Sequence, residues 1–264
     1  MSAIDKKYEK MLAGRKRRNA KRKFLLSLKV LLALAFFAAL VWGANFFYNS
    51  NYFKIKNISV EGNRYYSSDE IRKWADVATG ENIFEIDKKK IEDKLIDNLI
   101  RLKSATMKKI FPDSVELIIT ERKPFVIAVF GGKYYVLDNE GIVLEALSGS
   151  IPGDYKNLIQ VKNGLKSHPE IGEKIARRNI LSSADIYEAL DLEIKNKIKE
   201  AYISDGPEQD IIMVTTDAKK IIFGTSDKIA DKNAILRQIL DNVSKSGIYY
   251  SVIDLKNTGN PVIK

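Results

Sequence analysis

Phe53-Lys-Ile-Lys-Asn-Ile-Ser-Val-Glu-Gly-Asn63 contains a short β-strand that is rich in β-branched residues and ends at the turn pair Gly62-Asn63. Ser67-x-x-Glu70 comes next and matches a helix-capping box. The helix that it starts carries apolar residues at the spacing of one face and stops at a glycine: Ile71, Trp74, Ala75, Ala78 and Gly80. A folded domain therefore begins here with a strand and an amphipathic helix.

The following residues complete that domain. Asp87 can cap a second helix, whose apolar residues run from Ile91 to Ile100. A strand at 102–110, a turn at 111–114 and a strand at 115–121 end the unit. The order is β-α-α-β-β, which predicts two helices on one face of a three-stranded sheet. We expect the large aromatic side chains of this unit to fill its core: Trp74, Phe84 and Phe111.

The rest of the chain has a β-rich pattern. Two β-rich runs, 125–130 and 133–138, flank Gly131-Gly132 and predict a hairpin. Further strands are expected at 142–147, 201–204, 211–215, 220–224 and 248–256, with helices from Ser182 to about Ile198 and at 229–245. This half is therefore predicted to be a mostly antiparallel sheet with helices on one face, which makes the fold class α+β.

The N-terminus carries most of the net charge of +10. Residues 1–23 hold ten Lys or Arg and two acids, whereas the chain beyond Lys29 is nearly neutral. Residues 24–47 form an uninterrupted apolar run of 24 residues, and a helix of that length spans about 36 Å, enough to cross a bilayer. Aromatic residues at the end of the run suit an interface, and the basic flank predicts a cytoplasmic N-terminus with the rest outside.

Three alternatives for this region are less well supported. A cleaved signal peptide has a shorter apolar core and a small residue where Trp42 stands. A buried helix of a soluble domain normally has a polar face, which this run lacks. Nucleic-acid binding is not needed to explain the basic tail, since topology and anionic lipid already do.

Candidate catalytic and metal-binding groups are few. The chain has no cysteine, which excludes disulfides, zinc-thiolate sites and cysteine nucleophiles. Its one histidine, His168, stands beside a proline in a polar segment and is expected on a surface loop. No metal, phosphate-binding or nucleophile motif is present, so we predict a protein that is not an enzyme and needs no cofactor.

Three motifs of the first domain and its linker are familiar. They resemble a POTRA domain of the FtsQ/DivIB cell-division proteins. The three motifs are the opening at 53–63, the link Gly-Glu-Asn-Ile-Phe84 and the ending Phe-Pro-Asp-Ser-Val-Glu-Leu-x-Ile-x-Glu-Arg-Lys-Pro124. The second half is also similar to this family. The similar motifs are the hairpin with Tyr-Tyr-Val-Leu-Asp138, the strand Lys-Ile-Ile-Phe-Gly224 and the motif Asp254-Leu255-Lys256. The expected organisation is a basic tail (1–23), a transmembrane helix (24–47), a POTRA domain (52–122), a β domain (123–256) and a short C-terminal strand or tail (257–264).

The resemblance implies a division protein at the septum that binds the extracytoplasmic parts of FtsL-like and FtsB/DivIC-like single-pass membrane proteins and helps to regulate septal cell-wall synthesis. In the family, a partner segment adds to the sheet just after the Asp-Leu-Arg motif. The corresponding partner-binding residues here are Asp254, Leu255, Lys256, Asn257, Thr258, Gly259, Asn260, Pro261, Val262 and Ile263. Pro261 lacks a donor and fits an edge strand only where no donor is needed.

Further division membrane proteins are expected to use the POTRA domain through a sheet edge at Val115–Glu121. The alternatives are a membrane-anchored sensor and a POTRA-containing translocation component, and the latter would need a β-barrel for which 264 residues leave little room.

Overall fold

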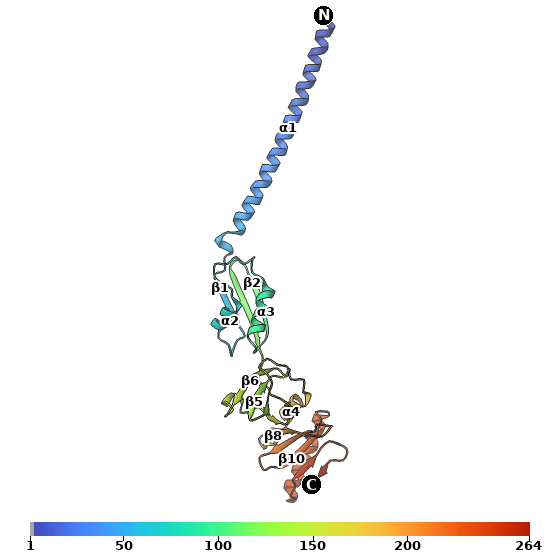
Figure 1. Cartoon of the computed structure of the whole chain (residues 1–264). Helices are drawn as coiled ribbons and strands as arrows, with labels where there is room; N and C mark the ends of the chain where they lie inside the picture. Colours follow the sequence, from blue (N-terminus) through green and yellow to red (C-terminus); the bar gives the residue numbers. More distant parts are fainter. Residues whose placement is uncertain (1–2) are drawn as a thin grey trace. The chain divides into compact units, whose positions relative to one another are not determined.

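The computed structural model describes the backbone of residues 3–264 and the side chains from residue 21 onward (Figure 1). The chain forms two compact units. The first comprises Met1–Ser59, Asp76–Lys88 and Met107–Leu117, and the second Val60–Ala75, Lys89–Thr106 and Ile118–Lys264.

A single long helix, α1 (Ala3–Tyr48), opens the chain. Its part from Lys21 to Tyr48 is long and apolar enough to cross a membrane, and its most apolar window is not buried by any part of the protein. The predicted apolar run at 24–47 lies inside this part. Most side chains of the predicted basic tail lie outside the described residues.

The predicted β-α-α-β-β domain is present. Its elements are β1 (Asn57–Glu61), α2 (Ser68–Ala75), α3 (Lys88–Asn98), β2 (Leu102–Ile110) and β3 (Ser114–Glu121). The sheet order is β1-β3-β2. Ser67 caps α2, since its Oγ accepts the N–H of Glu70 at 3.2 Å, as the capping box predicts.

Two expectations for this domain are wrong. Trp74, Phe84 and Phe111 are 38, 41 and 55 % exposed, because aliphatic side chains such as those of Ile71 and Leu95 already fill the space between helices and sheet. Strand β3, at Val115–Glu121, is the central strand, so the predicted docking edge there is already paired on both sides. The long edge strand is β2.

A nine-stranded sheet forms the second half, in the order β12-β11-β10-β9-β8-β7-β4-β5-β6. Its first strands are β4 (Val126–Phe130), β5 (Lys133–Leu137), β6 (Val143–Ser148) and β7 (Gln160–Lys162). The later ones are β8 (Ile198–Ile203), β9 (Ile211–Thr215), β10 (Lys220–Gly224), β11 (Val252–Asp254) and β12 (Val262–Ile263). Most pairs are antiparallel, as predicted, while β4–β7, β7–β8 and β10–β11 are parallel.

The hairpin β4–β5 turns at Gly131 and Gly132, whose φ angles of 58° and 76° suit the two-residue turn that favours glycine. Side chains then alternate across the sheet. Those of Ala128 and Tyr135 face the main core, whereas those of Ile127 and Val136 face a smaller cluster on the other side.

Helices α4 (Arg178–Ala189), α5 (Leu192–Lys195) and α6 (Ile229–Ser246) contribute to the main core. Three boundaries differ from the prediction. Helix α4 begins before Ser182, which is buried within it, because the buried stripe already starts at Ile180. Ile198 begins strand β8 instead of ending a helix, and only Val252–Asp254 of the expected last strand pairs in the sheet.

Candidate functional site

The C-terminal edge of the nine-stranded sheet consists of β11 and β12. Ile253 lies opposite Ile263, and Asp254 lies opposite Val262, in antiparallel register. Lys264 and Val252 exchange both backbone hydrogen bonds, at 2.9 and 3.0 Å. The chain's own C-terminus therefore covers the outer side of β11, and β12 becomes the outermost strand of this sheet as described.

The free side of β12 can be read from this register. In an antiparallel pair, residues that exchange hydrogen bonds alternate with residues whose N–H and C=O point away from the partner strand. Lys264 is of the first kind, so Ile263, one position earlier, directs its N–H and C=O to the open edge. Pro261 is two positions earlier and directs only a C=O there, because it has no N–H.

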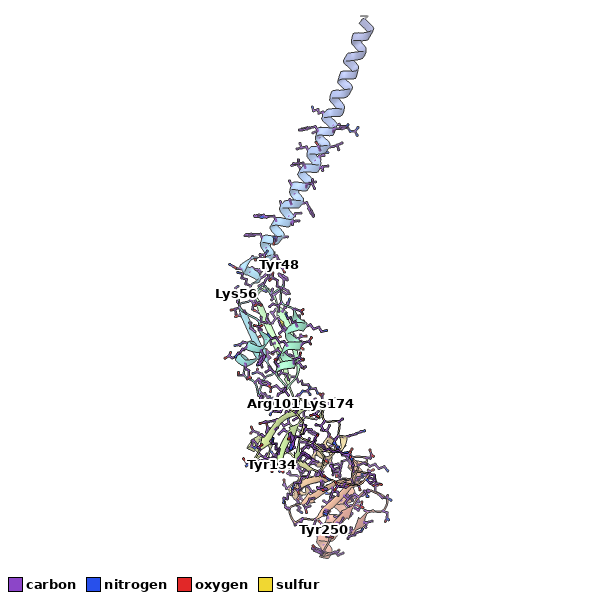
Figure 2. The ribbon with its side chains drawn as sticks, in the orientation of Figure 1. Tyr48, Lys56, Arg101, Tyr134, Lys174 and Tyr250 are labelled. Carbon is purple, nitrogen blue, oxygen red and sulfur yellow. The ribbon has the colours of Figure 1, made fainter. Side chains whose placement is uncertain are left out.

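Exposed apolar side chains lie on β12 and in the segment before β11. Val262 and Ile263 are 39 and 44 % exposed, and Ile248 and Tyr249, in the segment before β11, are 59 and 84 % exposed. Sequence reasoning missed the last two because it placed them in the final strand. The sequence signal for them was the run Ile248-Tyr-Tyr250, of which only Tyr250, labelled in Figure 2, is buried. The Lys219 ammonium lies 4.2 Å from the centroid of the Tyr250 ring.

The predicted binding residues before β12 have different environments. Leu255 is fully buried in the core and cannot contact a partner directly. Lys256 pairs with Asp210 at 3.0 Å, and this hydrogen bond raises the pKa of the lysine above its ordinary value.

A turn links this part to β12. The side-chain oxygen of Asn257 accepts the N–H of Gly259 at 3.0 Å, and its backbone oxygen accepts the N–H of Asn260 at 3.1 Å. The turn reverses the chain after β11, so it sets the position of β12. Thr258 and Pro261 are half-buried next to it.

Catalytic or metal-binding geometry is not found in the described part of the chain. No group of three His, Asp or Glu side chains there could hold a metal ion. His168 lies exposed in a loop, where a ring nitrogen forms a 2.7 Å hydrogen bond with the Tyr135 hydroxyl. This contact explains the histidine as a packing residue of the β4–β5 hairpin.

One apolar N-terminal helix long enough to cross a membrane, a β-α-α-β-β domain and a β-rich domain with an apolar sheet edge define a class of two-domain α+β proteins with an N-terminal helix compatible with a membrane anchor. Two family models match this chain: "POTRA domain, FtsQ-type" at residues 53–122 and "Cell division protein FtsQ/DivIB, C-terminal" at residues 127–256. The chain belongs to the FtsQ/DivIB family of cell-division proteins, which confirms the resemblance inferred from the sequence.

Similar curated proteins have the same family names. The chain is 28 % identical over 222 residues to the cell division protein DivIB of Clostridium acetobutylicum, covering 79 % of this chain and 81 % of the relative. It is 23 % identical over 188 residues to FtsQ of Corynebacterium glutamicum, covering 71 and 78 %. A solved structure, the major extracytoplasmic domain of DivIB from Geobacillus stearothermophilus, matches with a TM-score of 0.32 and 15 % identity over 48 % of this chain and 97 % of that one.

Proposed function

We propose that this protein is a single-pass membrane component of the division complex, with a cytoplasmic N-terminus and its folded domains outside, at the septum. It acts by binding, without catalysis, and its partners are extracytoplasmic segments of FtsL-like and FtsB/DivIC-like proteins. Family membership and the apolar helix with its basic flank support this proposal.

The observation that carries the partner proposal is the open edge of β12. An incoming extended segment would pair with the N–H and C=O of Ile263 and with the C=O of Pro261. So few backbone bonds give little affinity alone, because each contributes only about 1 kcal/mol net. Burial of the exposed apolar side chains at 248, 249, 262 and 263 must supply most of the binding free energy.

These contributions, from backbone hydrogen bonds and from burial of apolar side chains, indicate what the partner segment would be like. It would be extended, with apolar side chains that cover Ile263 on the face of the sheet that carries the buried Ile253, and an aromatic or aliphatic residue near Tyr249. Binding would add a tenth strand and extend the hydrophobic core of the β domain past its present edge.

The sharpest test changes Ile263, which supplies both an outward N–H and an exposed apolar side chain to the open edge. In Ile263→Pro, the N–H that points to the open edge is lost, whereas both hydrogen bonds between Lys264 and Val252 can remain. We expect the full-length variant in nanodiscs to bind the co-produced FtsL-like and FtsB/DivIC-like proteins of the same bacterium at least ten-fold more weakly. Unchanged affinity would contradict the assignment of this edge.

Lys199→Ala is the control, since it changes an exposed residue of β8 in the same sheet, outside the predicted binding residues, and should bind normally. Deleting residues 257–264 should also abolish binding while the domain stays folded. This deletion is the weaker test, because it uncovers β11 and creates a new edge to which a partner could bind.

The POTRA domain offers a second surface. Strand β2 is a nine-residue edge strand, and the side chains of Ser104, Thr106 and Lys108 are exposed on it. We propose that this edge, in place of the central β3, is where other division membrane proteins contact the domain. Loss of midcell localisation on replacing residues 102–106 with a proline-containing segment would support this assignment, and normal localisation would oppose it.

A further inference from the structure

Aromatic rings gather in the first unit where α1 ends. Phe53 lies 5.0 Å from Phe47 and 4.9 Å from Phe84, measured between ring centroids. Phe84 in turn lies 5.2 Å from Tyr48 and 5.3 Å from Phe111. We call this group the aromatic collar, with these members: Phe47, Tyr48, Tyr52, Phe53, Phe84 and Phe111.

Backbone contacts attach the collar to the end of α1. The side-chain amide of Asn82 donates to the backbone oxygen of Tyr48 at 2.8 Å. The N–H of Ile83 donates to the oxygen of Phe53 at 3.0 Å. Rings that are far apart in the sequence are therefore held next to the helix end, and the link at 49–52 is not a free tether.

The collar is exposed although it is apolar. Phe47 is 60 % exposed, Tyr52 57 % and Phe111 55 %, and the neighbouring Ile110 is 48 % exposed. Contiguous exposed apolar surface of this kind marks a binding surface. Two of the aromatic side chains that were expected in the core of this domain, those of Phe84 and Phe111, lie here instead.

The position of the collar indicates what covers it. The stretch long and apolar enough to cross a membrane ends at Tyr48, which is itself a member of the collar, so both belong at one level of the bilayer. Tyr and Trp side chains suit the headgroup level of a membrane, and Phe side chains suit the boundary between headgroups and acyl chains just below it. Charges around the collar nearly cancel: Lys54, Lys56, Lys88, Lys108 and Lys109 against Glu81, Glu85, Asp87 and Asp113.

We propose that the aromatic collar inserts into the interfacial layer of the bilayer, so that the loops at 83–85 and 110–112 of the POTRA domain are bound to lipid. The inference rests on the transmembrane placement of α1 proposed above. Burial of aromatic surface holds the collar there, and the balanced charges make the contact independent of anionic lipid. The anchor thus includes residues from both the helix and the folded domain.

Nitroxide labels on single cysteines test the depth of the collar, since the chain has no cysteine of its own. Glu85→Cys reports on the collar, because residue 85 is exposed and adjoins Phe84. Gly43→Cys reports on the helix, where an added Cβ meets no atom within 4 Å. The full-length protein is placed in phosphatidylcholine vesicles, with and without phosphatidylglycerol, and the accessibility of each label to oxygen and to a water-soluble relaxer is compared.

We expect the label at 85 to report interfacial depth in both lipid compositions, and the label at 43 to report the hydrocarbon. The double change Phe84→Ser and Phe111→Ser should lower the oxygen-to-water accessibility ratio at 85 several-fold. Leu192→Ser, which removes an apolar residue 72 % exposed in the second unit, is the matched control and should leave it unchanged.

An aqueous label at 85 in the unchanged protein, with the label at 43 in the hydrocarbon, would overturn the collar proposal and leave the anchor intact. An aqueous label at 43 would overturn the anchor itself. Interfacial depth at 85 that persists without Phe84 and Phe111 would also overturn the proposal, because the rings would then not hold the loop.

Discussion

Glu140 is a carboxylate held between two cations in the second unit. One of its oxygens lies 2.8 Å from the Lys103 ammonium, and the other lies 2.8 Å from the Arg122 guanidinium. Arg122 also contacts the buried Asp138 at 2.6 Å. These hydrogen bonds, that from Lys103 first, lower the pKa of Glu140 from 4.5 to about 2. The ionised form is thus favoured in the folded protein.

Acid should weaken this cluster in a predictable direction. Because the folded pKa of Glu140 lies below the unfolded value, its stabilising effect is complete above about pH 4.5 and is lost as the pH falls toward 2. Glu140→Gln does not titrate, so we expect its urea midpoint to fall less between pH 7 and pH 3 than that of the unchanged full chain in detergent. An equal fall in both proteins would show that other groups govern the acid response.

Lys103→Gln is the companion variant. It removes the larger of the two causes of the shift, so the pKa of Glu140 should rise and the acid loss should begin at a higher pH. A loss at the unchanged pH would assign the shift to Arg122 alone.

At single residues, sequence patterns predicted helix caps and turns better than they predicted which side chains are buried. Ser67 and the Gly131-Gly132 pair act as expected, because their roles depend on neighbours a few residues away. Trp74 and Phe111 were misplaced, because whether a large ring is buried depends on the tertiary packing of aliphatic side chains around Leu95 and Met107. Leu255 belongs to the predicted binding set by its position in a motif, and no local pattern indicates that its side chain points into the core.

At the level of elements, α6 is joined to the sheet by a buried lysine. Lys232 is 3 % exposed, and its ammonium donates to the oxygens of Phe223 at 2.7 Å and Thr225 at 2.9 Å. Burial lowers the pKa of this lysine. The two acceptors belong to the end of β10 and the residue after it, so one side chain satisfies that end of the strand and sets the position of the helix.

Removing the ammonium should loosen this contact. Lys232→Met keeps the length of the side chain but leaves two carbonyl oxygens without their donor, which costs about 1–3 kcal/mol. We expect a lower urea midpoint for the full chain at pH 7. Arg237→Met on the same helix is the control, because its ion pair with Asp191 is exposed and 3.4 Å long, and the change should be below about 0.5 kcal/mol. Equal effects would show that Lys232 does not join helix and sheet.

Long elements were predictable and short ones were not. Strand β10 and helix α6 have strong patterns, and they begin and end within a residue of the prediction. Strands β7 and β12 have three and two residues, too few for a periodic pattern, and they form because neighbouring strands pair with them. The candidate site depends on β12. The Asp254-Leu255-Lys256 motif located this region in the sequence, whereas the open edge of β12 is evident only from the order of strands in the sheet.

For the whole molecule, the uneven distribution of charge has a structural explanation. The basic residues lie before the apolar part of α1 and at its start, where the proposed topology requires them, while the remaining chain is nearly neutral. Without cysteines, the domains after α1 are held together by their hydrophobic cores. The function proposed here requires both features, since a binding edge outside the cell needs an anchor of fixed orientation.

Orientation can be tested by moving charge. Replacing the basic residues nearest the apolar run by Gln should increase the fraction of inverted chains, because basic residues close to a membrane helix favour the cytoplasmic side. The seven replaced residues are Arg15, Lys16, Arg17, Arg18, Lys21, Arg22 and Lys23. Lys133→Cys, exposed beside the β4–β5 turn, provides the reporter, and a thiol reagent that cannot cross the membrane is added to intact cells.

The unchanged tail should give nearly complete labelling of Cys at position 133, and the neutralised tail should reduce it several-fold. The control replaces seven lysines far from the helix in the sequence: Lys156, Lys166, Lys174, Lys199, Lys220, Lys228 and Lys245. It changes the net charge by the same amount but should leave labelling intact, because the rule depends on basic residues near the membrane helix and not on total charge. Equal loss of labelling in both variants would mean that total charge governs insertion. Protection of the reporter in the protein with the unchanged tail would place the β domain and its edge strand on the cytoplasmic side.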